Sequence, residues 1–188
     1  AARAQGQDFS RTRNRLMRDA GVFMHNDEDM NSAEFGSCAL GVIGHTPFVK
    51  AMWFRGGWFD SLSALWREVS TGTFMANDGS GAAGQPGRNG GSILLKGELA
   101  PGASITYPIV IAWHFPNVHL TSGRPNDPNA IPLAAACGPD CTCTPPPAWR
   151  PYYAAHWPDA EAVFDHVAGQ FDSLRRRTQA FHDALFRS

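Results

Sequence analysis

Apolar and polar side chains alternate most clearly in residues 101–117, PGASITYPIVIAWHFPN, where large apolar residues occupy every second position. Alternation of this kind predicts a β-strand with one buried face. The apolar set comprises Ile105, Tyr107, Ile109, Ile111, Trp113 and Phe115. Proline cannot donate a hydrogen bond to a neighbouring strand, so Pro108 predicts an edge strand or a bulge. We therefore expect Trp113 and Phe115 in the core, and His114 as a hydrogen-bonded residue on the opposite face.

Shorter apolar runs predict further strands. The runs GVFMHN, GSCALGVIG and PFVKAMWF begin at residues 21, 36 and 47, and an acidic loop, NDEDMNSAE, separates the first two. The run SILLKGEL at residues 92–99 leads into Ala-Pro-Gly-Ala at residues 100–103, which predicts a type II turn. We expect this run and the strand after the turn to pair as a hairpin. The arginine-rich residues 1–20 show no sustained periodicity, and we interpret them as a loop or a short surface helix.

Two segments show helical periodicity. The first follows Asp60 and Ser61, either of which can cap a helix, and we expect it to be short and to pack on the core. Its apolar positions are Leu62, Leu65, Trp66 and Val69. The second covers residues 158–187, with Asp159 near its start, and carries a continuous apolar stripe. The stripe comprises Ala160, Phe164, Val167, Phe171, Leu174, Thr178, Phe181 and Leu185. At about 1.5 Å per residue this helix spans roughly 45 Å, more than a small sandwich can cover, so the stripe should extend onto another domain or chain.

The composition argues against several classes of function. A hydrophobic fraction of 43% over 188 residues suits a globular domain, and a net charge of −1 argues against binding to nucleic acid or to an anionic membrane surface. No apolar run reaches the ~20 residues that a membrane-spanning helix needs, and the N-terminal residues lack the apolar centre of a signal peptide. We therefore expect no nucleic-acid partner, no transmembrane segment and a cytoplasmic protein.

Three of the four cysteines cluster in a proline-rich segment. Cys137, Cys141 and Cys143 have the spacing C-x3-C-x-C, which differs from the paired C-x2-C of zinc ribbons. A structural zinc ion and a local disulfide with one free thiol both suit this spacing, and His156 is a candidate fourth zinc ligand. We expect no cofactor other than such a structural zinc ion.

Four ordered pieces of the chain resemble the N-terminal domain of glycoside hydrolase family 116, the family of β-glucosidases and of bile-acid or non-lysosomal glucosylceramidases. They are GVFMHNDEDMNSAEFGSCALGVIG, WFRGGWFDSLSALW, PGASITYPIVIAWHFPN and YYAAHWPDAEAVFDHVAGQFDSLRRRTQAFHDALF. The WHFPN sequence, which follows a Pro-Gly turn and an alternating strand, is the most specific part. The resemblance runs from Gly21 to the end of the chain.

The resemblance implies a two-part enzyme, an N-terminal β-sandwich followed by an (α/α)6 barrel that carries the catalytic carboxylates. The chain would be mainly β, with part of the antiparallel sandwich at residues 21–151 and a long helix toward the barrel at residues 152–188. Residues 1–20 precede the sandwich, and residues 116–151 form a Pro- and Cys-rich excursion from it. No residue of this chain is assigned a catalytic role.

Retaining glycosidases use two carboxyl groups about 5 Å apart. No pairing at short spacing is visible among the acidic residues scattered through predicted turns and helix starts, which are Asp60, Asp78, Glu98, Asp127, Asp140 and Asp159. Asp60 and Asp159 sit at predicted helix starts and Asp78 precedes a glycine, so capping and turn formation account for them. The candidate substrate-binding residues are instead Trp58 and Trp157, which lie beside glycine and proline breaks and could stack on a sugar ring.

Three functions follow from these observations. We expect a non-catalytic N-terminal portion of a retaining β-glucosidase or glucosylceramidase, which supports the catalytic barrel and meets the β-glucoside substrate only through it. The first alternative is a stand-alone carbohydrate-binding β-sandwich. The second is an interaction module whose cysteines bind zinc and whose terminal helix docks on a partner.

Overall fold

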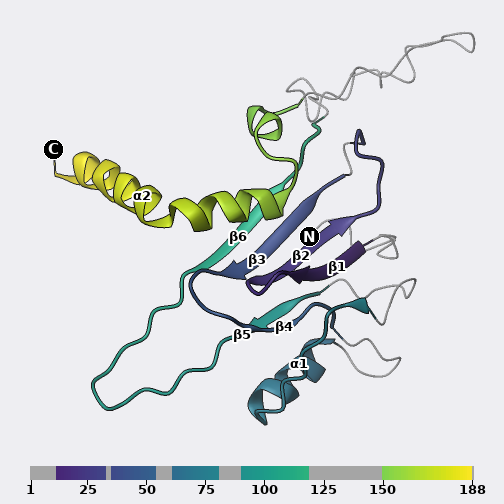
Figure 1. Cartoon of the computed structure of the whole chain (residues 1–188), viewed down its shortest axis with the longest axis vertical. Coiled ribbons are helices and arrows are strands. Elements are labelled where there is room, and N and C mark those ends of the chain that lie inside the picture. Colours follow the sequence, from purple (N-terminus) through teal and green to yellow (C-terminus); the bar gives the residue numbers. More distant parts are fainter. Residues whose placement is uncertain (1–11, 33–34, 54–60, 81–89, 119–149, 188) are drawn as a thin grey trace, which may run out of the picture.

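A computed structural model describes residues 12–32, 35–53, 61–80, 90–118 and 150–187. Within these residues the chain forms two antiparallel sheets and two α-helices (Figure 1). The long C-terminal helix lies on one face of the larger sheet, and the smaller sheet packs against the other face. This arrangement confirms the predicted fold, an antiparallel, sheet-rich chain that ends in one long helix.

The larger sheet has the strand order β1-β2-β3-β6, with every pair antiparallel. Its strands are β1 (Thr12–Met17), β2 (Gly21–Asn26), β3 (Ser37–Val42) and β6 (Ile109–His114). Gly21 pairs with Gly41, and a Cβ on Gly21 would lie 2.0 Å from the carbonyl oxygen of Leu40, so only glycine fits there. Among the described strands, β6 lies at an edge of this sheet, as Pro108 predicted, and the Pro108 carbonyl oxygen accepts a hydrogen bond from the Ile43 N–H just before β6 begins.

The smaller sheet consists of β4 (Phe48–Lys50) and β5 (Ser92–Leu94). It packs over the middle of the larger sheet, where the buried residues Val22, Val49 and Ala51 form a core between the two layers. Met24, Leu40 and Ile93 lie at the margin of this core and are partly buried. The two layers therefore enclose an apolar core as the sheets of a β-sandwich do.

Helix α2 (Ala160–Phe186) begins on the opposite face of the larger sheet. The Asp159 side chain accepts a hydrogen bond from the Ala162 N–H and caps the helix, as predicted. Ala160 is fully buried and Phe164 is 3% exposed. The core on this face comprises Met17, Phe23, Ala39, Ala112, Ala160 and Phe164.

The second half of α2 leaves the sheet. The backbone of Gln170 departs from helical geometry, at φ −120° and ψ 15°, directly after Gly169, and the helix changes direction there (Figure 1). Beyond this kink, Phe181 is 67% exposed and Leu185 is 56% exposed. The distal part of the stripe is thus not covered by the described part of the chain, and its packing on another domain or chain stays a prediction.

Helix α1 (Ser61–Ser70) is the predicted short helix, but its packing differs from the prediction. Leu62 and Trp66, expected to pack on the core, are 63% and 73% exposed, and Val69 is also exposed. The half-buried side of α1 carries Leu65 and Glu68 instead. Glu68 binds a buried lysine of β4, described below, and this contact turns the apolar stripe of α1 toward solvent.

The buried face of β6 is the opposite of the one predicted. Trp113 is 64% exposed and Phe115 is 51% exposed, whereas Ala112 is 6% and His114 is 1% exposed. Helix α2 packs closely on the small residues of the larger sheet, and a Cβ on Gly41 would lie 2.6 Å from the Phe164 ring. Close packing of a helix on a sheet thus selects the face with small side chains, whereas the pattern of large apolar residues indicated the other.

Two further expectations need correction. β5 pairs with β4 and β6 pairs with β3, so the predicted hairpin between them does not form, although the type II turn does, with Gly102 at φ +80°. The segment between them, residues 95–108, crosses from one sheet to the other as a long open loop (Figure 1). Residues 12–17, expected in a loop or helix, form β1, whose pairing with β2 supplies the order that their sequence pattern lacks.

Neither helix of the described part of the chain has both the length and the apolar character that crossing a bilayer requires.

Candidate functional site

The WHFPN sequence joins the end of β6 to the start of the C-terminal segment. His114 is buried, and its Nε2 donates a hydrogen bond of 2.8 Å to the carbonyl oxygen of Trp157. Because a carbonyl oxygen only accepts, the imidazole carries a proton on Nε2. Tyr153, in the 3-10 helix η3 (Tyr152–Ala155), lies edge-to-face with His114 and donates its hydroxyl to the Phe115 carbonyl oxygen at 2.6 Å. The signature therefore attaches the entry of α2 to the larger sheet.

Asn117 attaches the acidic loop to the same place. Its side chain is buried, and Nδ2 donates hydrogen bonds to the carbonyl oxygens of Met30 and Ser32 at 2.6 and 3.0 Å. On the outer side of the loop, Arg150 donates to the Asn31 Oδ1 at 3.0 Å. Asn117 and Ser32 are 85 residues apart in the sequence. The asparagine therefore joins two segments that are distant along the chain.

We predict that Asn117→Ala lowers the free energy of unfolding by about 2 kcal/mol, because it removes the buried amide that donates to the carbonyl oxygens of Met30 and Ser32. Asn117→Asp should cost at least as much at neutral pH, since it places a carboxylate against the same two carbonyl oxygens. Urea denaturation measures both values.

Asn31→Ala is the matched control in the same loop. Asn31 is exposed, so this substitution should change the unfolding free energy by less than about 0.5 kcal/mol. Equal stability of the wild-type chain and the Asn117→Ala variant would show that the asparagine does not hold the loop.

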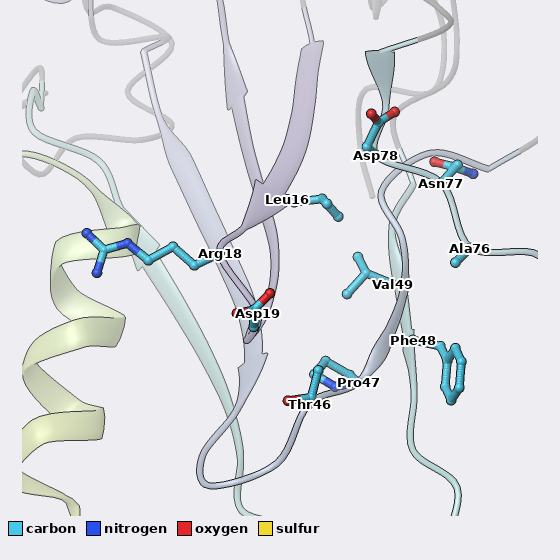
Figure 2. A pocket seen from close by; sticks show the side chains of 10 residues that line it. All are labelled: Leu16, Arg18, Asp19, Thr46, Pro47, Phe48, Val49, Ala76, Asn77 and Asp78. Carbon is cyan, nitrogen blue, oxygen red and sulfur yellow. The ribbon is translucent and has the colours of Figure 1, made fainter.

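A shallow pocket of about 330 Å³ lies between the β1–β2 turn and β4 (Figure 2). Leu16, Val49 and Phe48 supply apolar walls. Arg18 lies at its margin in the left-handed conformation, at φ 44°, and its guanidinium points away from the pocket, toward α2. The pocket therefore has no cation directed into it from this turn.

Asp78 is the acidic group on the opposite side of this pocket. Its Oδ1 accepts hydrogen bonds from the Ser80 hydroxyl at 2.6 Å and the Ser80 N–H at 2.9 Å. These bonds lower the pKa of the Asp78 carboxyl below its ordinary value of 3.8, so it stays ionised. A general acid needs a raised pKa, and Asp78 instead acts as a turn residue, as predicted.

A buried ion pair lies beneath a second hollow, of about 350 Å³, between α1 and β4. Lys50 is 5% exposed, and its Nζ lies 2.6 and 2.5 Å from the two carboxylate oxygens of Glu68. Burial alone would raise the pKa of Glu68, but the hydrogen bonds from Lys50 and from the Met75 N–H, with the charge of Lys50, bring it below its ordinary value. Glu68 is therefore a carboxylate that holds α1 to β4.

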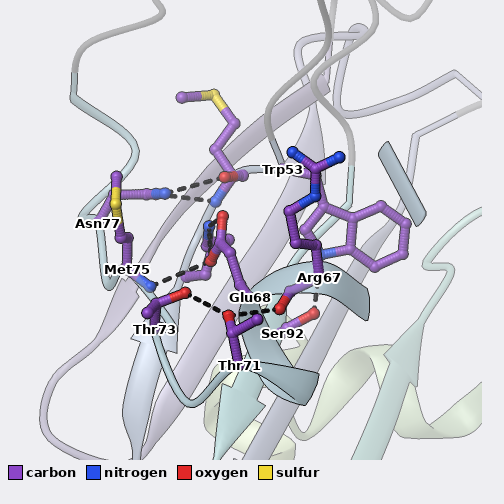
Figure 3. Close-up of polar contacts among 10 residues, drawn as sticks. Trp53, Arg67, Glu68, Thr71, Thr73, Met75, Asn77 and Ser92 are labelled. Atoms are coloured by element: carbon purple, nitrogen blue, oxygen red, sulfur yellow. Dashed lines mark hydrogen bonds and ion pairs between the residues drawn. The ribbon is translucent and has the colours of Figure 1, made fainter. Parts of the chain in front are cut away.

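Asn77 extends this network to the backbone (Figure 3). Its amide donates to the Met52 carbonyl oxygen at 2.9 Å and accepts from the Met52 N–H at 3.0 Å. Nearby, the Trp53 indole N–H donates to the Ser92 hydroxyl at 2.7 Å. Each polar group named here has a protein partner, so the hollow is held by a structural network.

Of the predicted substrate-binding residues, the structure describes Trp157. Its ring is half-buried and lies 5.1 Å from the His166 ring and 5.8 Å from the His156 ring, centroid to centroid. Trp58 lies outside the described residues. Sugar stacking by these two tryptophans stays a prediction.

Cys137, Cys141 and Cys143 also lie outside the described residues, so zinc or disulfide formation there stays a prediction. Cys38 is described as a free thiol, and burial raises the pKa of that thiol, which disfavours the reactive thiolate. His156 contacts the ring of Tyr152 at 4.4 Å. Within the described ranges, no three metal-ligating side chains converge.

A family model described as "beta-glucosidase 2, glycosyl-hydrolase family 116 N-term" matches residues 2–174. The chain belongs to this family. A search of curated proteins finds no match. The family 116 match begins before Gly21, where the resemblance in the sequence begins, so β1 belongs to the same domain as the strands that follow. It ends within α2, on the part of the helix that follows the kink.

Several carboxylates of this family 116 domain already have structural partners. Glu161 on α2 forms an ion pair with Arg15 of β1 at 2.5 Å, Asp159 caps α2, and Asp27 pairs with Arg13 at 2.8 Å. These groups therefore position strands and helix.

Sequence reasoning missed the two residues that organise the site, Lys50 and Asn117. A usable signal existed for Lys50, because a lysine within the apolar run PFVKAMWF needs a carboxylate partner once the strand is buried. The two loop carbonyls that Asn117 binds have no signal in the sequence.

Proposed function

We propose that this chain is a non-catalytic part of a retaining β-glucosidase or glucosylceramidase, and that it supports the catalytic (α/α)6 domain of that enzyme. The observation that carries the proposal is the family 116 N-terminal match over residues 2–174. In a retaining mechanism one carboxylate attacks the sugar while a second carboxylic acid protonates the leaving group, and water then releases the glucose. We place both carboxyl groups in the catalytic domain.

The exposed half of α2 supports this role. Phe181, Leu185 and Phe186 are all more than half exposed, on a helix that has left its own sheet. Phe181 and Leu185, four positions apart, lie on one face of the helix, and such a face suits packing against other helices. An (α/α)6 barrel presents helices on its outside, so we propose that α2 packs there.

The family match supports a proposal for the substrate class. We propose β-glucosides, including glucosylceramide, as substrates of the whole enzyme, with the aglycone chosen by the catalytic domain. Trp157 lies near the entry of α2, and we propose that it contributes to one wall of the cleft only where the two domains meet.

The test compares hydrolysis of 4-nitrophenyl β-glucoside by the chain alone and by the chain mixed with the catalytic domain that we propose for the enzyme, encoded in the same gene or in a companion gene. We expect no hydrolysis by the chain alone and at least tenfold more by the mixture than by the catalytic domain alone. A Phe181→Asp, Leu185→Asp variant should lose this gain, because two buried carboxylates oppose docking.

Met30→Asp is the matched control, since Met30 is 67% exposed on a loop far in sequence from α2 and should leave the gain unchanged. Glucoside hydrolysis by the chain alone would contradict the proposal. So would a gene that stops after residue 188 with no gene for a catalytic partner. Glucan binding by the chain alone would favour the carbohydrate-binding alternative.

A further inference from the structure

One face of the larger sheet changes from buried to exposed along a single row of residues. Val22 of β2, Leu40 of β3 and Ile111 of β6 lie side by side in register on the face opposite α2. Val22 is fully buried, Leu40 is partly buried, and Ile111 is 54% exposed. These three aliphatic side chains share one face of the sheet. The differences in their exposure therefore show which strands the second layer covers.

Neighbouring rows show the same change. Val42 on β3 is 2% exposed, whereas its partner Ile109 on β6 is 55% exposed. Cys38 on β3 is partly buried, whereas its partner Trp113 is 64% exposed. The side chains of β6 on this face are thus the uncovered continuation of an apolar core. We call Ile109, Ile111 and Trp113 the open face of β6.

The smaller sheet stops short of this open face. β4 contacts β2, and β5 contacts β2 and β3, so the next position in this sheet beyond β5 lies opposite β3 and β6. One edge of β5 pairs with β4, and among the described residues no strand pairs with its other edge. An apolar face and a strand edge therefore lie next to each other, and both are unpartnered within the described part of the chain.

We propose that the open face of β6 binds a β-strand that adds to the free edge of β5 and presents apolar side chains at alternate positions. A strand satisfies both features together, because its backbone pairs with β5 while every second side chain covers Ile109, Ile111 or Trp113. An amphipathic helix would cover the face but leave the β5 edge unpaired. The site continues the existing interface between the two sheets, and it does not depend on the family assignment.

The probe is a capped seven-residue peptide of alternating valine and threonine, titrated into the full chain and followed by amide chemical shifts. We expect saturable binding, with shifts in β5 and β6. The same peptide with an N-methyl group on every residue cannot donate backbone hydrogen bonds from either edge and should bind at least tenfold more weakly.

Ile111→Lys should also weaken binding at least tenfold, because a charged side chain would enter the apolar interface. Leu99→Lys is the matched control, since Leu99 is 56% exposed on the segment between β5 and β6, and binding should be unchanged. The comparison of the two peptides uses the unmodified chain and does not depend on whether the Ile111 variant folds.

Four results would overturn the proposal. Equal binding of the plain and N-methylated peptides would show that no strand is added. Equal binding of an amphipathic helical peptide at the same amides would assign the face to a helix. No saturable binding, or a dimer that Ile111→Lys dissociates, would show that a strand partner is absent or that a second copy covers the face.

Discussion

Replacing Glu68 with alanine is expected to lower the free energy of unfolding by about 3–5 kcal/mol, because it leaves the buried charge of Lys50 without a partner. Lys50 is 5% exposed, and both of its short contacts to carboxylate oxygens are to Glu68. The variant also removes the acceptor of the Met75 N–H, so the segment after α1 should loosen with it. Urea denaturation, with hydrogen exchange of α1, measures the loss.

The double variant Lys50→Met, Glu68→Leu distinguishes two causes of this loss. One is the cost of burying an unpaired lysine, and the other is the loss of a stabilising ion pair. If the penalty of Glu68→Ala arises from the unpaired lysine, the double variant should recover most of the lost stability. Glu98→Ala is the matched control on the exposed segment before β6, with an expected change within about 0.5 kcal/mol. A loss equally large in the double variant would mean that the pair itself stabilises the fold.

The ion pair of Lys50 and Glu68 also makes the free energy of unfolding depend on pH. Because the pKa of Glu68 in the folded chain lies below its ordinary value of 4.5, its stabilising effect is complete above that value. The effect is lost as the pH falls through the lowered pKa. Unfolding free energies of wild type and Glu68→Gln should therefore converge as the pH falls below 4.5, and curves that stay parallel would contradict this assignment.

Phe164→Ala is expected to lower the free energy of unfolding by about 3–5 kcal/mol. The Phe164 ring is 3% exposed and fills the space over Gly41 between α2 and the larger sheet. Its removal leaves a cavity between helix and sheet, which the surrounding core fills only in part. Thermal and urea denaturation measure the effect.

Phe181→Ala is the matched control, the same substitution on the same helix beyond its kink. Phe181 is 67% exposed in the chain alone, so its removal should change stability by less than about 0.5 kcal/mol. Similar losses for the two variants would mean that the distal half of α2 packs on the chain in solution.

Local pattern predicted both α-helices and every described strand except β1. The turn at residues 100–103, the Asp159 cap and the edge position of the Pro108 strand follow from the backbone chemistry of single residues, which acts over a few positions. β1 was missed because its polar, arginine-rich sequence has no periodicity of its own. β1 is ordered by its pairing with β2. This pairing depends on residues outside the β1 segment, so the sequence of that segment alone does not predict it.

The candidate site was less predictable than the fold. His114 was expected to be hydrogen-bonded, and it is, but its partner, the Trp157 carbonyl oxygen, lies 43 residues away in the chain. The pairing of Lys50 with Glu68 spans 18 residues and depends on the angle at which α1 meets β4. Long-range contacts of this kind have no periodic signature.

By itself the sequence determined the element types, the long C-terminal helix and, through WHFPN and its neighbours, the family, because propensities, caps, turns and motifs are local chemistry. Only the tertiary structure decided which face of β6 is buried. Alternation identifies two faces but not the layer that packs on each. Here α2 needs the small face that carries Ala112, and the large apolar face with Trp113 is left open beyond β5.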